Sequence, residues 1–159
     1  MGCCASSPDG AAHGGARSSA LATLGITILK QVGEGNFSSV HICEKDGEQF
    51  AVKICDPAND DRQLYVEALM DEIAALKHVK GHANVLRLHL VEKIEDIFYL
   101  VMQYLDSGDV CDYVMRKQSL TEYEASRIVL QVGRALKHCH DKGVIHRDVK
   151  PENLLMNKG

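Results

Sequence analysis

Three side chains with complementary chemistry lie within six positions of one another near the end of the 159-residue chain, at Asp148, Lys150 and Asn153. A carboxylate can orient a hydroxyl group and accept its proton. A lysine ammonium can offset negative charge on a group in transfer, and a carboxamide oxygen is a neutral ligand that suits a hard cation such as Mg²⁺. Together these groups have the chemistry needed to transfer a phosphoryl group to a hydroxyl group.

A second set of residues has the properties needed to hold phosphate. Gly33 and Gly35 lie in the segment 33–40 (GEGNFSSV), and glycines let a backbone approach phosphate oxygens and point its N–H groups at them. Alone, this glycine pair fits an ordinary hairpin loop equally well. One hairpin later, the tripeptide 51–53 (AVK) would put the ammonium of Lys53 beside the phosphates that such a loop covers.

The elements that would position these groups begin at Ile26, where short runs of β-branched and apolar residues alternate with turn residues. The pair Asp46–Gly47 is typical of a tight hairpin turn, and a polar turn is expected around Glu95–Asp96. We therefore predict an antiparallel sheet of five strands, near residues 26–32, 39–45, 48–55, 85–92 and 97–104.

A helix is predicted over residues 62–79, because Leu69, Ile73 and Leu76 recur at helical spacing and Asp60 or Asp61 can cap its start. Glu72 borders this apolar stripe, so it can face the sheet and pair with Lys53. The alternative is that Glu72 is a solvated surface charge.

The pattern over residues 121–142 predicts another helix. Thr121 and Glu124 form a capping box, and Gly143 supplies a left-handed stop. The apolar residues of this helix trace one face that we expect to be core: Ala125, Ile128, Val129, Val132, Ala135, Leu136 and Cys139.

Residues 146–153 (HRDVKPEN) match the catalytic loop H-R-D-x-x-x-x-N of protein kinases, with Lys-Pro-Glu in the manner of serine/threonine kinases. With the glycine-rich segment and Lys53, the chain resembles a eukaryotic-type serine/threonine protein kinase from about Ile26 to its end. Ser38 stands where the third glycine of G-x-G-x-x-G would fall. Segments 124–127 (EASR) and 150–155 (KPENLL) look most like the calcium/calmodulin-dependent kinase group.

The resemblance implies an α+β protein kinase-like fold, with a five-stranded N-terminal lobe that carries one helix and with the first helices and catalytic loop of a helical C-terminal lobe. We expect a flexible leader over residues 1–22, the first lobe and hinge over 23–105 and the second lobe over 106–159. The implied ligands are ATP and Mg²⁺, and the implied partner is a protein with a serine or threonine hydroxyl.

The resemblance also assigns roles to individual residues. Asp148 would accept the substrate proton, Lys150 would stabilise charge and Asn153 would bind Mg²⁺. His146 and Arg147 would be scaffold. The segment 100–109 (LVMQYLDSGD) would join the lobes, although alone it fits a core strand ending in a Ser-Gly turn. The implied nucleotide-binding residues are Val32, Gly33, Gly35, Val40, Ala51, Lys53, Glu72, Met102, Gln103, Leu105 and Asp109.

The first residues, MGCCAS, fit the myristoylation pattern M-G-x-x-x-[ST], in which Gly2 receives the acyl chain. Palmitoylation of Cys3 or Cys4 would add the second chain that stable anchoring requires. We therefore expect attachment to the cytoplasmic face of a membrane. The alternative is a coincidental Met-Gly start followed by two exposed thiols.

The composition excludes several classes of protein. A net charge of −4 and a pI near 6.0 argue against nucleic-acid binding, which requires clustered Lys and Arg. The six cysteines form no C-x-x-C pair, which suits a reducing compartment. No apolar run approaches the roughly 20 residues that span a bilayer.

No Asp-Phe-Gly motif occurs in the sequence. In the family, that motif holds magnesium and precedes the substrate-binding helices. We therefore expect a truncated chain with slow or absent phosphoryl transfer. Three alternatives remain open: a fragment of an active membrane-tethered kinase, an inactive interaction module at the membrane, or a domain that binds ATP without turnover.

Overall fold

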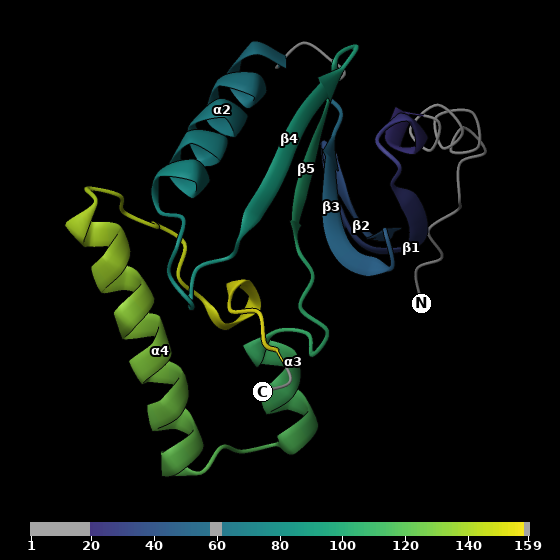
Figure 1. The fold of residues 1–159 in the computed structure, drawn as a ribbon. Coiled ribbons are helices and arrows are strands. Elements are labelled where there is room, and N and C mark those ends of the chain that lie inside the picture. The colour runs from purple at the N-terminus through teal and green to yellow at the C-terminus, as the bar shows by residue number, and fades with distance from the viewer. Residues whose placement is uncertain (1–19, 58–61, 158–159) are drawn as a thin grey trace, which may run out of the picture.

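The computed structural model describes residues 20–57 and 62–157 (Figure 1). Its main element is an antiparallel sheet of five strands in the order β1-β2-β3-β5-β4, so the predicted sheet and the α+β class are confirmed. The strands are β1 (Thr27–Gly35), β2 (Ser38–Lys45), β3 (Glu48–Cys55), β4 (Leu88–Ile94) and β5 (Ile97–Gln103).

Helix α2 (Arg62–His78) packs on one face of this sheet (Figure 1). The chain then leaves β5 and forms α3 (Val110–Lys117), α4 (Glu122–Asp141) and a short 3-10 helix, η1 (Pro151–Asn153). Within the described ranges, no helix is both long and apolar enough to cross a membrane.

The tight turns lie where the sequence predicts them. Asp46 and Gly47 both have positive φ, at 52° and 78°, which is the backbone twist that a two-residue hairpin between β2 and β3 requires. Glu95 also has positive φ, at 56°, between β4 and β5. Strand β4 begins three residues later than expected, at Leu88, because a turn in which Val85 donates to the His82 carbonyl precedes it.

The alternation of side chains along β5 divides the core in two. Tyr99 and Val101 face the side opposite α2 and pack with Val52 and Ile54 of β3. Phe98 and Leu100 face α2, where they pack with Cys55, Leu69 and Ile73. Even-numbered residues of β3 and odd-numbered residues of β5 therefore lie on the face opposite α2, and the others lie on the face that α2 covers.

Leu21 is fully buried in the cluster on the face opposite α2. It lies in a helical turn at residues 20–23, ahead of β1, and Ile26 donates a backbone hydrogen bond to its carbonyl. The leader expected over residues 1–22 overlaps this core position. A single leucine in a Gly/Ala/Ser-rich stretch gives no periodic signal, so the sequence pattern missed it.

The C-terminal end of α4 is joined to the end of α2 and the loop that follows it. The Lys142 ammonium donates to the His78 carbonyl at 2.9 Å, while His78 Nε2 donates to the Lys142 carbonyl at 3.1 Å. His138 Nε2 donates to the carbonyl of buried Val79 at 2.8 Å, and its ring stacks on His82 with centroids 4.9 Å apart. These contacts hold α4 beside the sheet unit.

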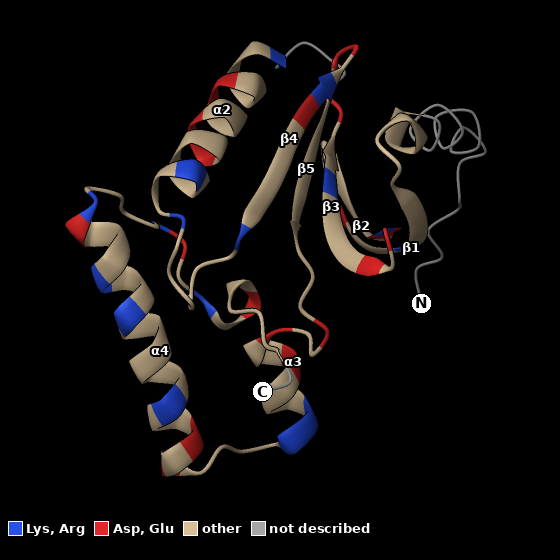
Figure 2. Ribbon diagram, in the orientation of Figure 1, with Lys and Arg blue, Asp and Glu red and all other residues tan. Residues whose placement is uncertain are grey.

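The capping box at the start of α4 and the left-handed Gly143 after its end are confirmed. The prediction that its apolar face is core is confirmed in part, since five of its seven residues are half-buried: Ala125, Ile128, Val132, Ala135 and Leu136. Cys139 is buried and Val129 is 69% exposed. The contacts of α4 with the loop after α2 reach from the C-terminal end of α4 to Gln131, whose amide oxygen accepts a hydrogen bond from Asn84 at 3.0 Å. Lys and Arg residues lie along α4, with acidic residues at its ends (Figure 2).

Candidate functional site

The register of the sheet puts three predicted nucleotide-binding residues on one face. Lys53 pairs with Val40 on β2 and with Leu100 on β5. Ala51 lies two positions from Lys53 on β3, so its side chain is on the same face of the sheet. This face is the one that α2 covers, since Leu100 packs in the α2 cluster.

Lys53 and Glu72 form the predicted pair across the sheet and helix. The Lys53 ammonium donates to both carboxylate oxygens of Glu72, at 2.9 Å each. Glu72 follows the buried Leu69 by three residues and precedes the buried Ile73, so the apolar stripe of α2 turns it toward β3. Glu72 is therefore not an unpaired surface charge, although its side chain is 44% exposed.

The predicted catalytic residues converge in the loop around η1. Asp148 Oδ2 lies 2.9 Å from the Lys150 ammonium. Asn153 Nδ2 donates to the same oxygen at 2.8 Å and to the Asp148 carbonyl at 2.9 Å. Pro151 begins η1, and this short turn brings Asn153 back to Asp148.

The hydrogen bonds from Lys150 and then Asn153 lower the pKa of the Asp148 carboxyl below its usual range, and Asp148 in turn raises the pKa of Lys150. Both groups are therefore charged at neutral pH. A carboxylate with a lowered pKa is a weak base but a good hydrogen-bond acceptor, so it is suited to orienting a hydroxyl group.

Backbone strain marks the same loop. Arg147 has a φ of 65°, a left-handed backbone conformation that residues other than glycine rarely adopt. Such outliers persist where surrounding contacts hold them, and they concentrate at functional sites. Here the His146 Nδ1 accepts a hydrogen bond from the Asp148 amide at 3.3 Å, and Asn153 fixes the Asp148 carbonyl.

The glycine-rich segment forms the end of β1, the turn at Asn36–Phe37 and the start of β2. A Cβ added to Gly35 would lie 3.3 Å from Ser38 Oγ, so the strands approach closely at the position where the third glycine is replaced. Gly33 pairs with Val40. Val32 lies at an irregularity in the β1 register and is half exposed.

The predicted adenine-binding residues lie at the end of β5 and beyond it. Met102 is buried and pairs with Ala51, on the same face as Lys53. The Gln103 amide donates to the Arg87 carbonyl at 2.9 Å, so only the Gln103 carbonyl is left for the predicted adenine contact. Leu105 follows in the half-buried connection to α3.

Asp109 has a structural role besides the predicted ribose contact. Its Oδ1 accepts a hydrogen bond from the Asp112 amide at 2.8 Å and so caps α3. It also forms an antiparallel bridge with Leu155, a half-exposed residue that the sequence interpretation did not assign to the site. Residues 154–159 resemble a strand entering a tight turn, but the bridge from Leu155 to Asp109 could not be inferred from that pattern.

The site residues form two separate clusters, Lys53 with Glu72 and Asp148 with Lys150 and Asn153. Within residues 20–57 and 62–157, no hydrogen bond or ion pair joins one cluster to the other. Their convergence on one nucleotide stays a prediction. Gly2, Cys3, Cys4 and the proposed helix caps Asp60 and Asp61 lie outside the described residues.

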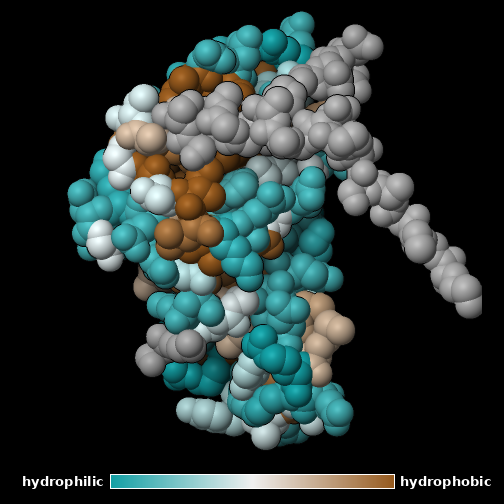
Figure 3. All heavy atoms as spheres, turned by 90° about the vertical axis from the view of Figure 1, so that its right-hand side faces the viewer, coloured by the Kyte–Doolittle hydropathy of each residue, from teal (hydrophilic) through white to brown (hydrophobic). Residues whose placement is uncertain are grey.

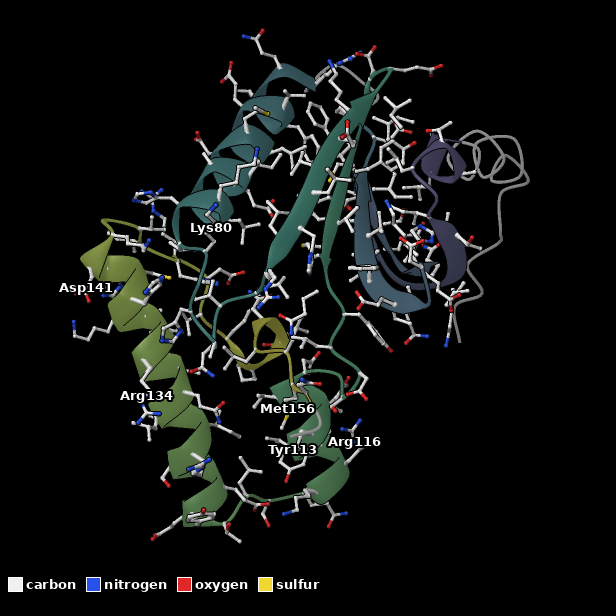
Figure 4. All side chains as sticks on the ribbon, in the orientation of Figure 1. Lys80, Tyr113, Arg116, Arg134, Asp141 and Met156 are labelled. Carbon is white, nitrogen blue, oxygen red and sulfur yellow. The ribbon has the colours of Figure 1, made fainter. Side chains whose placement is uncertain are left out.

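Two cavities lie away from these clusters. One of about 160 Å³ is lined by residues 34–39, Ile54 and Asp56, and Ile54 belongs to the sheet face opposite Lys53. The other, of about 490 Å³, lies beside α3, where Figure 4 shows Tyr113, Arg116 and Met156 together. Neither cavity is lined by Lys53 or Asp148.

Residues 26–159 match the sequence model of a family described as "Protein kinase domain". The chain is 38% identical over 130 residues to CBL-interacting protein kinase 9 of Oryza sativa subsp. japonica, covering 80% of this chain and 28% of that protein. It is 40% identical over 126 residues to putative ribosomal protein S6 kinase alpha-2 of Caenorhabditis elegans, covering 78% of this chain and 16% of that protein.

A third relative is serine/threonine-protein kinase DCLK3 of Mus musculus, which is 33% identical over 129 residues. That match covers 80% of this chain and 16% of the mouse protein. The chain thus spans less than a third of the length of each of these curated relatives.

Proposed function

The chain belongs to the protein kinase domain family, and on that premise we propose that it binds Mg-ATP and transfers a phosphoryl group to the hydroxyl of a serine or threonine in a protein. The observation that carries this proposal is the cluster in which Asp148, Lys150 and Asn153 meet within hydrogen-bonding distance. One loop thus carries a carboxylate that can accept a hydrogen bond from a hydroxyl group, a cation and an amide.

In this proposal, Asp148 orients the substrate hydroxyl and accepts its proton as the new bond forms. The lowered pKa of Asp148 keeps it ionised, and Lys150 offsets the negative charge of the group in transfer. Lys53, held by both oxygens of Glu72, provides a second fixed cation for the phosphates. Lys53 needs no reorganisation to serve this purpose, because its partner already orients it.

The residues of the loop fit a magnesium ion. Asn153 uses its amide nitrogen for both bonds to Asp148, so its amide oxygen is not consumed by them. An amide oxygen is a ligand that Mg²⁺ accepts. Bound Mg²⁺ would neutralise charge on the phosphate oxygens, and Asn153 would hold it.

The adenine end of the nucleotide would lie against Val32, Val40, Ala51 and Met102. Val40, Ala51 and Met102 share the Lys53 face of the sheet, which supports this orientation. The Gln103 carbonyl and the backbone of Leu105 would bind the adenine edge. Asp109 would reach the ribose while capping α3.

Two finer assignments belong to this proposal. We place the chain in the calcium/calmodulin-dependent kinase group, on the resemblance of segments 124–127 and 150–155. We also propose acylation at Gly2 and at Cys3 or Cys4, with anchoring at the cytoplasmic face of a membrane, on the motif alone. Replacement of Gly2 by Ala should abolish incorporation of a myristate analogue, and undiminished incorporation would refute the anchor.

Nucleotide binding by the purified chain tests the proposed function. We expect saturable binding of Mg-ATP, and about a tenfold or larger loss of affinity in Lys53→Met, because a preorganised cation at the phosphates is removed. Thermal stability should change little, since Glu72 is 44% exposed and such pairs add little stability. Lys77→Met, the same change in the last turn of α2, is the control. Equal affinity in wild type and Lys53→Met would overturn the assignment of Lys53.

A further inference from the structure

The turn between β1 and β2 is hydrogen-bonded to one residue just after β3 and to one residue of α2. The Phe37 carbonyl accepts a hydrogen bond from the Asp56 amide at 3.0 Å, just after β3. It also lies 3.4 Å from the hydroxyl of Tyr65 on α2, a long hydrogen bond. The Phe37 and Tyr65 rings pack with centroids 5.2 Å apart and planes tilted by 56°.

Tyr65 is fixed on the helix side of this contact. It is half buried and packs against the cluster of Cys55, Leu69 and Ile73. Burial, and then contact with Cys55, raises the pKa of the Tyr65 hydroxyl. The hydroxyl therefore remains a hydrogen-bond donor throughout the physiological range of pH.

Tyr65 and Glu72 lie on the same face of α2. They are seven residues apart, with Leu69 between them at four residues from Tyr65, so all three project toward the sheet. The two contacts that α2 makes with the glycine-rich turn and with Lys53 are separated by about 10 Å along the helix axis. A rigid helix that contacts both groups must move them together.

We propose that Tyr65 is a positioning residue that couples α2 to the glycine-rich turn, so that the turn is seated over the phosphates when Glu72 holds Lys53. This inference rests on the proposed function, because it names how that nucleotide site is regulated. Tyr65 touches no reacting atom and acts through its contacts with the turn, above all the carbonyl and ring of Phe37.

The alternative is that Tyr65 merely fills space next to the core. The two readings differ in their effect on coupling. Sites about 10 Å apart that share no partner normally have additive effects. If Tyr65 only packs, the fold-losses of nucleotide affinity in Tyr65→Phe and in Glu72→Gln should multiply in the double variant. If α2 couples the two contacts, the loss in the double variant should be smaller than the product of the two single losses.

The experiment measures the Mg-ATP dissociation constant and hydrogen exchange of the free chain in Tyr65→Phe and Tyr65→Leu. The first variant keeps the ring and removes the hydroxyl; the second also removes the aromatic contact. We expect weaker nucleotide binding, by about threefold in Tyr65→Phe and about tenfold in Tyr65→Leu. Exchange should accelerate in residues 34–40 and stay unchanged in β5. Tyr123→Phe is the matched control, because Tyr123 is 73% exposed on α4.

The outcomes separate this inference from the proposed function. If wild type binds no Mg-ATP, the proposed function fails, and exchange in residues 34–40 of the free chain still decides the coupling. If wild type binds nucleotide while both Tyr65 variants match it in affinity and in exchange, the coupling is overturned and the proposed function stands. If Tyr65→Leu does not fold, Tyr65→Phe alone decides, since it preserves packing. Multiplicative losses with Glu72→Gln would also overturn the coupling.

Discussion

A single carboxylate organises the loop around η1. Asp148 accepts hydrogen bonds from Lys150 and Asn153, and its own amide donates to His146. The adjacent Arg147 carries the left-handed backbone strain. In the proposed function, the charge of Asp148 has two roles: it pairs with Lys150 and it receives the substrate proton.

The variant Asp148→Asn tests the charge of Asp148 without changing the size of its side chain. The amide preserves size but removes the negative charge, so it can neither accept a proton nor pair with Lys150. We expect steady-state phosphoryl transfer from Mg-ATP to a serine-containing peptide to fall by about 10²–10⁴-fold, with the Mg-ATP dissociation constant nearly unchanged. Asp141→Asn makes the same chemical change in an exposed pair with Lys137 and should have no effect on transfer. Transfer at the wild-type rate in Asp148→Asn would contradict the assigned role.

At this scale, what the sequence could predict depended on how far apart the partners lie. Asp148 and Asn153 meet because a proline-started turn spans five positions, and such local geometry follows from the residue types. The Lys53–Glu72 pair spans nineteen residues, and it was predicted from the apolar stripe of α2 together with the resemblance to protein kinases. The contact of Tyr65 with Phe37 was not predicted, because it depends on how a turn leans on a helix 28 residues away.

The start of α4 shows how one side chain can join two helices. Glu124 completes the capping box with Thr121 and also accepts hydrogen bonds from Tyr113 and Lys117 of α3. Lys117 and then the Thr121 backbone lower the pKa of the Glu124 carboxyl to about 2. The α3–α4 connection is therefore stabilised by the ionised form of Glu124.

The pH dependence of stability tests this connection. Glu124 has a lower pKa folded than unfolded, where it is about 4.3. Its contribution is therefore complete above pH 4.3 and is lost as pH falls toward 2. We expect Glu124→Gln to lower the melting temperature at pH 6, and we expect the difference from wild type to disappear near pH 2. Melting curves by circular dichroism measure this. Glu122→Gln is the control, and a difference that does not depend on pH would contradict the ionic explanation.

Element boundaries were predictable where local chemistry sets them. The Asp46–Gly47 turn and the Thr121–Glu124 box fix their neighbours through their own backbone and side chains. The late start of β4 depends on the His82–Val85 turn, which competes with strand pairing and has no apolar period. The apolar face of α4 has helical spacing, but spacing cannot tell how completely other elements cover that face.

At the scale of the whole molecule, two connections among residues 20–57 and 62–157 join the sheet unit to the helices that follow it. One is the chain itself, through β5 and the half-buried residues after Gln103. The other is the set of contacts between the ends of α2 and α4, including the reciprocal bonds of His78 and Lys142. Because α2 also carries Glu72 and Tyr65, this helix links α4, the lysine and the glycine-rich turn.

The sheet face opposite α2 depends on residues ahead of β1. Figure 3 shows hydrophobic residues on the side of the molecule where β1 lies. Leu21 and Ile26, in contrast, are buried with Tyr99 and Val101 of β5. The described residues that precede β1 thus help to close the core.

The variant Leu21→Ala tests whether this segment is an integral part of the fold. Removal of a fully buried leucine side chain leaves a cavity among β-strand residues that cannot all move to fill it. We expect the free energy of unfolding to fall by about 2–5 kcal/mol, measured by urea denaturation with an unchanged dependence on urea concentration. The matched control is Leu64→Ala on α2, because Leu64 is 70% exposed and should change stability by less than about 0.5 kcal/mol. Equal, small effects of the two substitutions would show that the sheet is stable without Leu21, and the fold would then begin at β1.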